Sequence, residues 1–181
     1  AAVAAASPVA QLLRLPARPT GHGPSFARNT AAALAQGGLI AFLDDDDEWT
    51  DVLHLQRCVA SMQPGSASAA ELLFGDQRAV RPDGSEHPGP LWLRGLEHRL
   101  RSNPDAQGAR QADLDSLLAA GAMCHLNTTV MQRRFFEALG GFDERLRYEE
   151  DRDLCLRAID SAQRVLYQPA QIGTHHIPDP A

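Results

Sequence analysis

Several features are scarce or missing in this chain of 181 residues. It has no excess of basic residues: 17 stand against 23 acidic ones, for a net charge of −6. That balance argues against nucleic acid or an anionic membrane as the main partner. No apolar run approaches the ~20 residues that a membrane-spanning helix needs. The alanine-rich start lacks the basic residues of a signal peptide. We therefore expect neither a transmembrane segment nor a secretory leader.

Cysteine is also scarce. Cys58, Cys124 and Cys155 lie far apart, and no two of them form a C-x-x-C pair. An odd count does not support a full disulfide framework, and buried free thiols in a reducing cytosol are the simplest interpretation. The sequence thus predicts three reduced cysteines.

The remaining composition is that of one folded domain with a sizeable core, since 44% of the residues are hydrophobic and 22% are charged. Helical patterns follow Ser25, as a helix cap, and Asp51. The apolar segment Leu39–Leu43 between them is typical of a strand buried on both faces of a parallel sheet. Further strands are expected at residues 10–17, 70–80, 125–132 and 164–168, helices at 113–121, 133–141 and 149–162, and a loose tail from 172. This alternation predicts one α/β domain with a mixed, mainly parallel sheet.

Four consecutive aspartates, Asp44–Asp47, follow the apolar segment in LIAFLDDDDEW. Ligands of open α/β sheets lie beyond the carboxyl ends of the strands, which is where the sequence places these residues. Side chains alternate along an extended chain, so Asp44 and Asp46 are expected to share one side. Neighbouring carboxylates repel one another unless a cation lies between them. A divalent ion carrying a diphosphate is one explanation, and a solvated acidic turn is the other.

A second acidic segment, Glu149–Asp151, precedes an amphipathic helical pattern in GGFDERLRYEEDRDLCLR. Acidic residues in a first helical turn interact favourably with the helix dipole, which is a purely structural explanation. A carboxylate there can instead act as a general base that takes the proton of a sugar hydroxyl, a contribution of about 10²–10⁴-fold in rate.

Together the two segments resemble the family 2 glycosyltransferases, which are inverting, nucleotide-sugar-dependent enzymes with a GT-A fold. In that family an Ala-Arg-Asn helix precedes a metal-binding D-x-D motif. A Gly-Gly-Phe-Asp segment later leads into a Glu-Asp pair followed by Leu and Arg. The counterparts here are residues 27–29, 44–46, 140–143 and 150–151, and a tryptophan follows the first acids as in the family. The resemblance spans residues 23–167 and is weakest over 81–111.

The resemblance implies roles for the first motif. Asp46 is expected to bind Mn²⁺ or Mg²⁺ directly, while Asp44 and Asp45 contact the ribose or support the metal. The run of four aspartates leaves this register open by one residue. Arg28 is expected close to the nucleotide.

The resemblance also implies roles for later residues. Asp151 would be the base that deprotonates the acceptor hydroxyl, and Glu150 would orient it. His175 and His176 either complete the metal site or form a surface pair in the loose tail.

The reaction implied is transfer of a sugar from a UDP, GDP or dTDP donor to a hydroxyl of a saccharide or lipid-linked acceptor, as in polysaccharide biosynthesis. It would take place in the cytoplasm, peripherally at the inner face of the membrane. Family members open with strands ending in a Pro-x-Tyr/Phe-Asn-like segment and in Asp-Asp-Gly-Ser, and nothing before Gly23 matches either. We therefore expect residues 1–181 to form a single GT-A domain that is incomplete at its N-terminus, without the first strands.

Two alternatives remain. The first is a non-catalytic sugar- or partner-binding module on a decayed GT-A scaffold, which the missing strands favour. The second is a nucleotidyltransferase, which ranks last because its glycine-rich phosphate loop is not visible near the N-terminus.

Overall fold

The computed structural model describes residues 9–63, 65–66, 68–89, 91–93, 95–120 and 124–179. Most of the alanine-rich start, in which no signal peptide was expected, lies outside these ranges. Within them, every helix is too short or too polar to cross a membrane.

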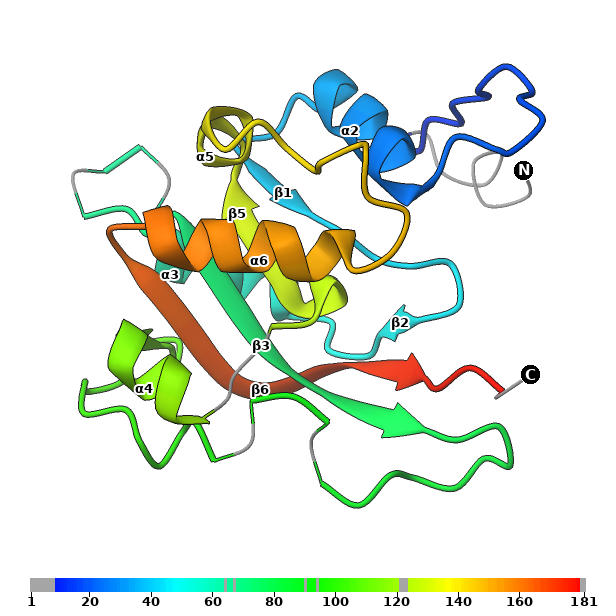
Figure 1. Ribbon diagram of the computed structural model, residues 1–181. Coiled ribbons are helices and arrows are strands. Elements are labelled where there is room, and N and C mark those ends of the chain that lie inside the picture. Colours follow the sequence, from blue (N-terminus) through cyan, green and yellow to red (C-terminus); the bar gives the residue numbers. More distant parts are fainter. Residues whose placement is uncertain are drawn as a thin grey trace.

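A six-stranded mixed sheet forms the centre of the described part (Figure 1). Its strands lie in the order β1 (Leu39–Ala41), β5 (Thr129–Gln132), β3 (Leu72–Val80), β6 (Val165–His176) and β2 (Glu48–Trp49), and β4 (Arg110–Ala112) also pairs with β6. β3 and β6 run in parallel over the longest register, whereas the other pairings between these strands are antiparallel. The α/β class and the mixed sheet are confirmed. The expected predominance of parallel pairing is not, because β5 returns between β1 and β3 in the opposite direction.

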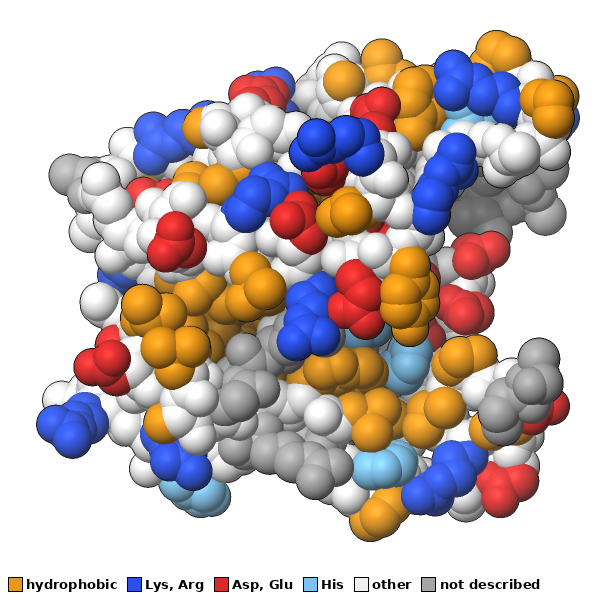
Figure 2. Space-filling model, in the orientation of Figure 1, with side chains coloured by type: hydrophobic (Ala, Val, Ile, Leu, Met, Phe, Trp, Pro, Cys, Tyr) orange, Lys and Arg blue, Asp and Glu red, His pale blue; other side chains and the backbone are white. Residues whose placement is uncertain are grey.

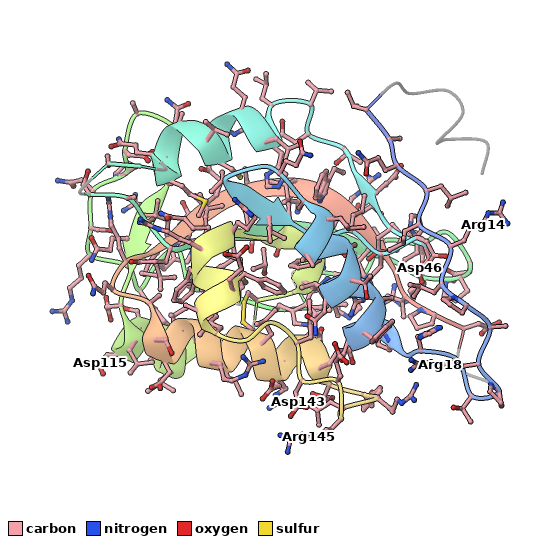
Figure 3. The ribbon with its side chains drawn as sticks, turned by 90° about the horizontal axis from the view of Figure 1, so that it is seen from above. Arg14, Arg18, Asp46, Asp115, Asp143 and Arg145 are labelled. Atoms are coloured by element: carbon pink, nitrogen blue, oxygen red, sulfur yellow. A yellow bond between two sulfur atoms is a disulfide. The ribbon has the colours of Figure 1, made fainter. Side chains whose placement is uncertain are left out.

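Helices cover both faces of this sheet. They are α2 (Pro24–Leu34), α3 (His54–Met62), α4 (Leu114–Ala120), α5 (Arg133–Ala138) and α6 (Glu150–Ser161), and a 3₁₀ turn, η1 (Leu126–Thr128), precedes β5. The view from above shows α3 and α6 on opposite sides of the sheet (Figure 3). Alternation along β3 explains this arrangement, because Leu72 joins the apolar cluster of Leu154 in α6 while Leu73 joins that of Met62 in α3.

The ends of the chain differ from the sequence-based expectations. Residues 10–17 form no strand. Helix α2 is capped by Gly23 with Pro24 in its first turn, and the Ser25 hydroxyl donates instead to the Leu146 carbonyl at 3.3 Å. The segment from 172 is not a loose tail but the second half of β6, which continues past a register shift opposite Gly75–Gln77.

The cysteines also differ from expectation. Cys124, just before η1, and Cys155, in α6, form a disulfide across a separation of 31 residues. Only Cys58 remains a free thiol; it is buried, and desolvation raises its pKa to about 11. The fold brings Cys124 and Cys155 together. Their spacing in the sequence does not predict this pairing.

Candidate active site

The four aspartates form a turn between β1 and β2. The Asp47 amide donates to the Asp44 carbonyl at 3.3 Å. Asp44 and Asp47 are partly buried, whereas Asp45 and Asp46 are exposed. The chain turns back after Asp44, so the side chains of these aspartates do not alternate as they would along an extended strand. Acidic side chains gather at a recess on the right-hand edge of the space-filling view (Figure 2), and Asp46 is labelled on the right-hand side of the view from above (Figure 3).

Asp47 is the most engaged carboxylate of the turn. Its side chain is only 1% exposed. It accepts hydrogen bonds from His175 Nδ1 at 2.8 Å, from the His176 amide at 2.7 Å and from the Asn127 side-chain amide. Because His175 donates through Nδ1, its Nε2 is the nitrogen left to act as a ligand. His175 thus contacts Asp47 through its side chain, whereas His176 does so through its backbone amide, with its Nδ1 farther away at 3.8 Å.

His125 completes this group. One ligand atom each of Asp47, His125 and His175 lie within 4.8 Å of one another. Burial lowers the pKa of His125, the charge of His175 lowers it further, and Asp151, Asp44 and Asp47 act in the opposite direction. The lowered pKa favours the neutral ring, which is the form that binds metals. Its Nδ1 is buried and has no hydrogen-bond partner within the described ranges.

Arg28 connects the acidic turn to helix α6. It donates to Asp44 at 2.5 Å and to Glu150 at 2.6 Å, with side-chain exposures of 21%, 30% and 11% for the three residues. Burial alone lowers the pKa of Arg28, but the bonds to the two carboxylates outweigh this and raise it. Glu150 therefore contacts Arg28, and no hydrogen bond between Glu150 and Asp151 is found among the described residues.

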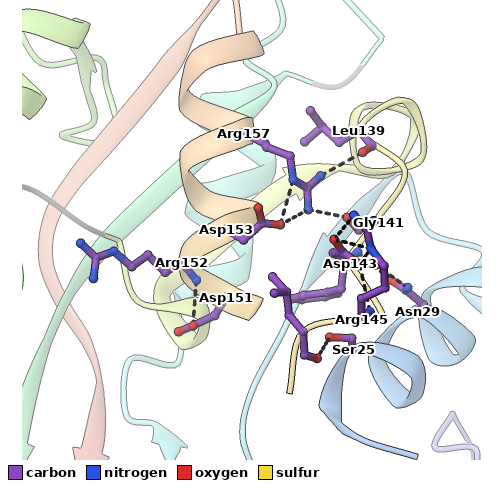
Figure 4. A network of polar contacts seen from close by, with 12 residues as sticks. Ser25, Asn29, Leu139, Gly141, Asp143, Arg145, Asp151, Arg152, Asp153 and Arg157 are labelled. Carbon is purple, nitrogen blue, oxygen red and sulfur yellow. Dashed lines mark hydrogen bonds and ion pairs between the residues drawn. The ribbon is translucent and has the colours of Figure 1, made fainter. Parts of the chain in front are cut away.

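Asp151 lies in the first turn of α6. One of its oxygens accepts from the Arg152 amide at 2.8 Å (Figure 4). Its neighbour Glu150 is joined through Arg28 to Asp44, which places the first turn of α6 beside the acidic turn. The preceding Glu149 has φ 61°, in the left-handed region that non-glycine residues rarely adopt. Backbone strain of this kind is concentrated at functional sites.

The Gly-Gly-Phe-Asp segment is fastened to α2 and α6 (Figure 4). The Asn29 side chain accepts from the Phe142 amide and donates to its carbonyl, each at 2.9 Å. A Cβ on Gly141 would lie 2.6 Å from Asn29 Oδ1, which explains the glycine. Arg157 pairs with Asp153 and donates to the carbonyl of Gly141 at 2.8 Å. These contacts set the position from which α6 begins.

The structure adds residues that the sequence analysis missed. Asn127 accepts from the Asp44 amide at 2.9 Å and donates to Asp47, and its carbonyl accepts from the Trp49 indole at 2.7 Å. Trp49 thus packs beneath the acidic turn. The available signal was the pair of polar residues His125 and Asn127 at the start of the strand expected at residues 125–132, of which only Thr129–Gln132 form β5.

A family model described as glycosyl transferase family 2 matches residues 3–109, more than half of the chain and including the acidic turn. A curated pre-mycofactocin glycosyltransferase of Mycobacterium tuberculosis, found in strains CDC 1551 and H37Rv, is 25% identical over 161 residues. The alignment covers 87% of this chain and 31% of the relative. The chain therefore spans about a third of the length of the curated relatives that it matches.

Solved structures of Staphylococcus aureus TarS, residues 1–349, are similar to this chain. The complex with UDP has a TM-score of 0.60 at 17% identity, covering 86% of this chain and 40% of TarS. The complex with UDP-GlcNAc has a TM-score of 0.62 at 17% identity, covering 88% of this chain and 40% of TarS. At this identity the similarity concerns the fold, and it confirms the GT-A type expected from the motifs.

Proposed function

Because the chain belongs to glycosyl transferase family 2, we propose that it transfers a sugar from a nucleoside-diphosphate donor to an acceptor hydroxyl with inversion. One observation carries this proposal. Asp47 of the acidic turn lies with His125 and His175, and Arg28 joins Asp44 of the same turn to Glu150, which directly precedes Asp151. Carboxylates and imidazoles beside a candidate base are the groups that a metal-assisted transfer of this kind requires.

A uridine nucleotide is the donor that we favour over GDP or dTDP. The support is the similarity of the fold to TarS, whose structures contain UDP and UDP-GlcNAc. Arg28, with Asp44 and Asp45 on the acidic turn, would lie beside the nucleotide. In this arrangement Arg28 acts by holding Asp44 and Glu150 in place. The acceptor would be a saccharide or a lipid-linked sugar, and the latter would bring the chain to the inner face of the membrane.

A divalent ion fits the group Asp47, His125 and His175. The fit rests on the convergence of their ligand atoms and on the buried, unpartnered Nδ1 of His125. Two imidazoles favour Mn²⁺ over Mg²⁺, which prefers oxygen ligands. Asp46, exposed on the same turn, would supply a further carboxylate from the open side. When bound, the ion would offset the negative charge that develops on the leaving diphosphate.

Asp151 would accept the proton of the acceptor hydroxyl. One of its oxygens is held by the Arg152 amide, which orients the carboxylate, and among the described residues the other oxygen has no partner. Arg28 holds the neighbouring Glu150 against the acidic turn, so the base-bearing turn and the donor site keep a fixed distance.

The test compares Asp151→Asn with the wild type in UDP binding and in sugar transfer, using the full-length gene product. We expect UDP affinity to be unchanged and transfer to fall by about 10²–10⁴-fold, because only the proton acceptor is lost. Asp115→Asn, in the exposed part of α4, serves as the matched control and keeps both properties. Undiminished transfer by Asp151→Asn would remove Asp151 as the base. A wild type that binds no nucleotide would favour the non-catalytic module instead.

A further inference from the structure

The disulfide lies between the two halves of the candidate site. Cys124 directly precedes His125. Cys155 follows Asp151 by four residues, which places Cys155 and Asp151 on one face of α6. Both cysteines are buried, with exposures of 2% and 4%. The bond therefore joins the segment that carries the histidine to the helix that carries the candidate base.

Other ties between these two elements are few. Leu126 of η1 and Leu154 of α6 belong to the same apolar cluster. Among the described residues, no hydrogen bond or ion pair connects residues 124–128 to α6. The ion pairs of Arg28 hold α6 to the acidic turn from the side of α2. These two elements are thus held together directly by apolar packing and one covalent bond, while Asp44 and Arg28 link Asn127 to Glu150 indirectly.

We propose that the disulfide Cys124–Cys155 is a positioning element of the transfer site, which keeps Asp151 in register with His125 and with the acidic turn that Asn127 holds. This inference rests on the proposed transferase function. The rate of transfer is sensitive to small displacements of the base from its substrate, because a shift of about 1 Å can lower the rate by about 10²-fold.

A consequence is that transfer responds to a dithiol reductant. One reductant thiolate attacks a disulfide sulfur and releases the other cysteine as a thiolate; the second reductant thiol then closes the reductant's own disulfide. Two electrons and two protons end on Cys124 and Cys155. Since both sulfurs are buried, we expect this reduction to be slow and to require local opening.

The experiment compares the wild type, Cys124→Ser/Cys155→Ser and Cys58→Ser. Thiols are first counted in protein that is purified without reductant and then unfolded. We expect one free thiol in the wild type, three after treatment with dithiothreitol, and none in Cys58→Ser before that treatment. Steady-state kinetics then separate positioning from binding. In the double variant kcat should fall by about 10–100-fold while KM for the donor stays within about threefold.

A second control separates positioning from loss of stability. Met62→Ala removes a buried side chain from the other apolar cluster and lowers the melting temperature, but leaves kcat unchanged below that temperature. Three free thiols in the untreated wild type, or wild-type kcat in the double variant, would overturn the inference while the transferase stands. An oxidised wild type with one thiol and no transfer would overturn the proposed function, and the positioning role with it.

Discussion

Single polar side chains hold this site together, each by making two contacts at once. Arg28 binds two carboxylates, Asn127 binds two aspartates, and Asn29 binds both backbone groups of Phe142. The family motifs predicted that Arg28, Asp44 and Asp151 serve one site, because motif order carries that information. They did not reveal Asn127, since an isolated polar residue before a strand has no periodicity and its partner lies 80 residues away.

Changing Asp47 or Asp46 of the turn to asparagine should have very different effects on the free energy of unfolding. Asp47→Asn puts an amide against the donors of His175, His176 and Asn127, and should lower the free energy of unfolding by about 1.5–3 kcal/mol. Asp46→Asn lies at an exposed position and should leave that free energy within about 0.5 kcal/mol of the wild type. Urea denaturation in the presence of EDTA measures both, and equal destabilisation by the two changes would refute the arrangement of the turn.

His54, the first residue of α3, makes the stability of the protein depend on pH. Burial lowers its pKa from the ordinary 6.5 in the folded protein. As the pH falls through 6.5, the unfolded chain takes up a proton that folded His54 does not. The free energy of unfolding must therefore decrease toward acid, by up to about 1.4 kcal/mol per pH unit from this group. Urea denaturation should be measured between about pH 5 and about pH 8. We expect the free energy of unfolding to decrease less steeply toward acid in His54→Phe than in the wild type, and as steeply as in the wild type in the exposed control His98→Gln.

At the scale of elements, the sequence predicted most helices and the central strands, because their apolar residues follow a clear period. It failed for the second half of β6. There Pro169 and Gly173 interrupt the pattern, and the strand is recognised only by its partners β3 and β2. This failure matters because β6 carries His175 into the site.

The packing of β2 against β6 leads to a test at Gly173. A Cβ at this position would lie 2.5 Å from the Glu48 backbone oxygen, which cannot move without unpairing β2. We expect Gly173→Ala to lower the melting temperature and to weaken Mn²⁺ binding severalfold, because β2 directly follows the acidic turn. Gly38→Ala, where a Cβ meets nothing within 4 Å, should change neither property. Calorimetry and thermal unfolding supply both readings, and full Mn²⁺ affinity in Gly173→Ala would show that β2 does not position the turn.

At the scale of the whole molecule, motif order predicted the GT-A fold, while strand direction could not be predicted. Apolar periodicity reports which residues are buried but not which way a strand runs, and so β5 appeared in the sequence as one more strand of a parallel sheet. The structure shows the result of its reversal. The acidic turn after β1 and the segment before β5 lie side by side, which brings Asn127 and His125 to the aspartates.

The proposed transfer depends on a metal–nucleotide site formed where these segments meet. Its most direct test is calorimetric titration of UDP into the wild type, Asp46→Asn and His175→Ala, each with Mn²⁺ and with EDTA. We predict saturable binding to the wild type only with Mn²⁺, and at least about 10-fold weaker binding to both variants, since each loses a ligand. Equal UDP affinity of the wild type in Mn²⁺ and in EDTA would contradict it.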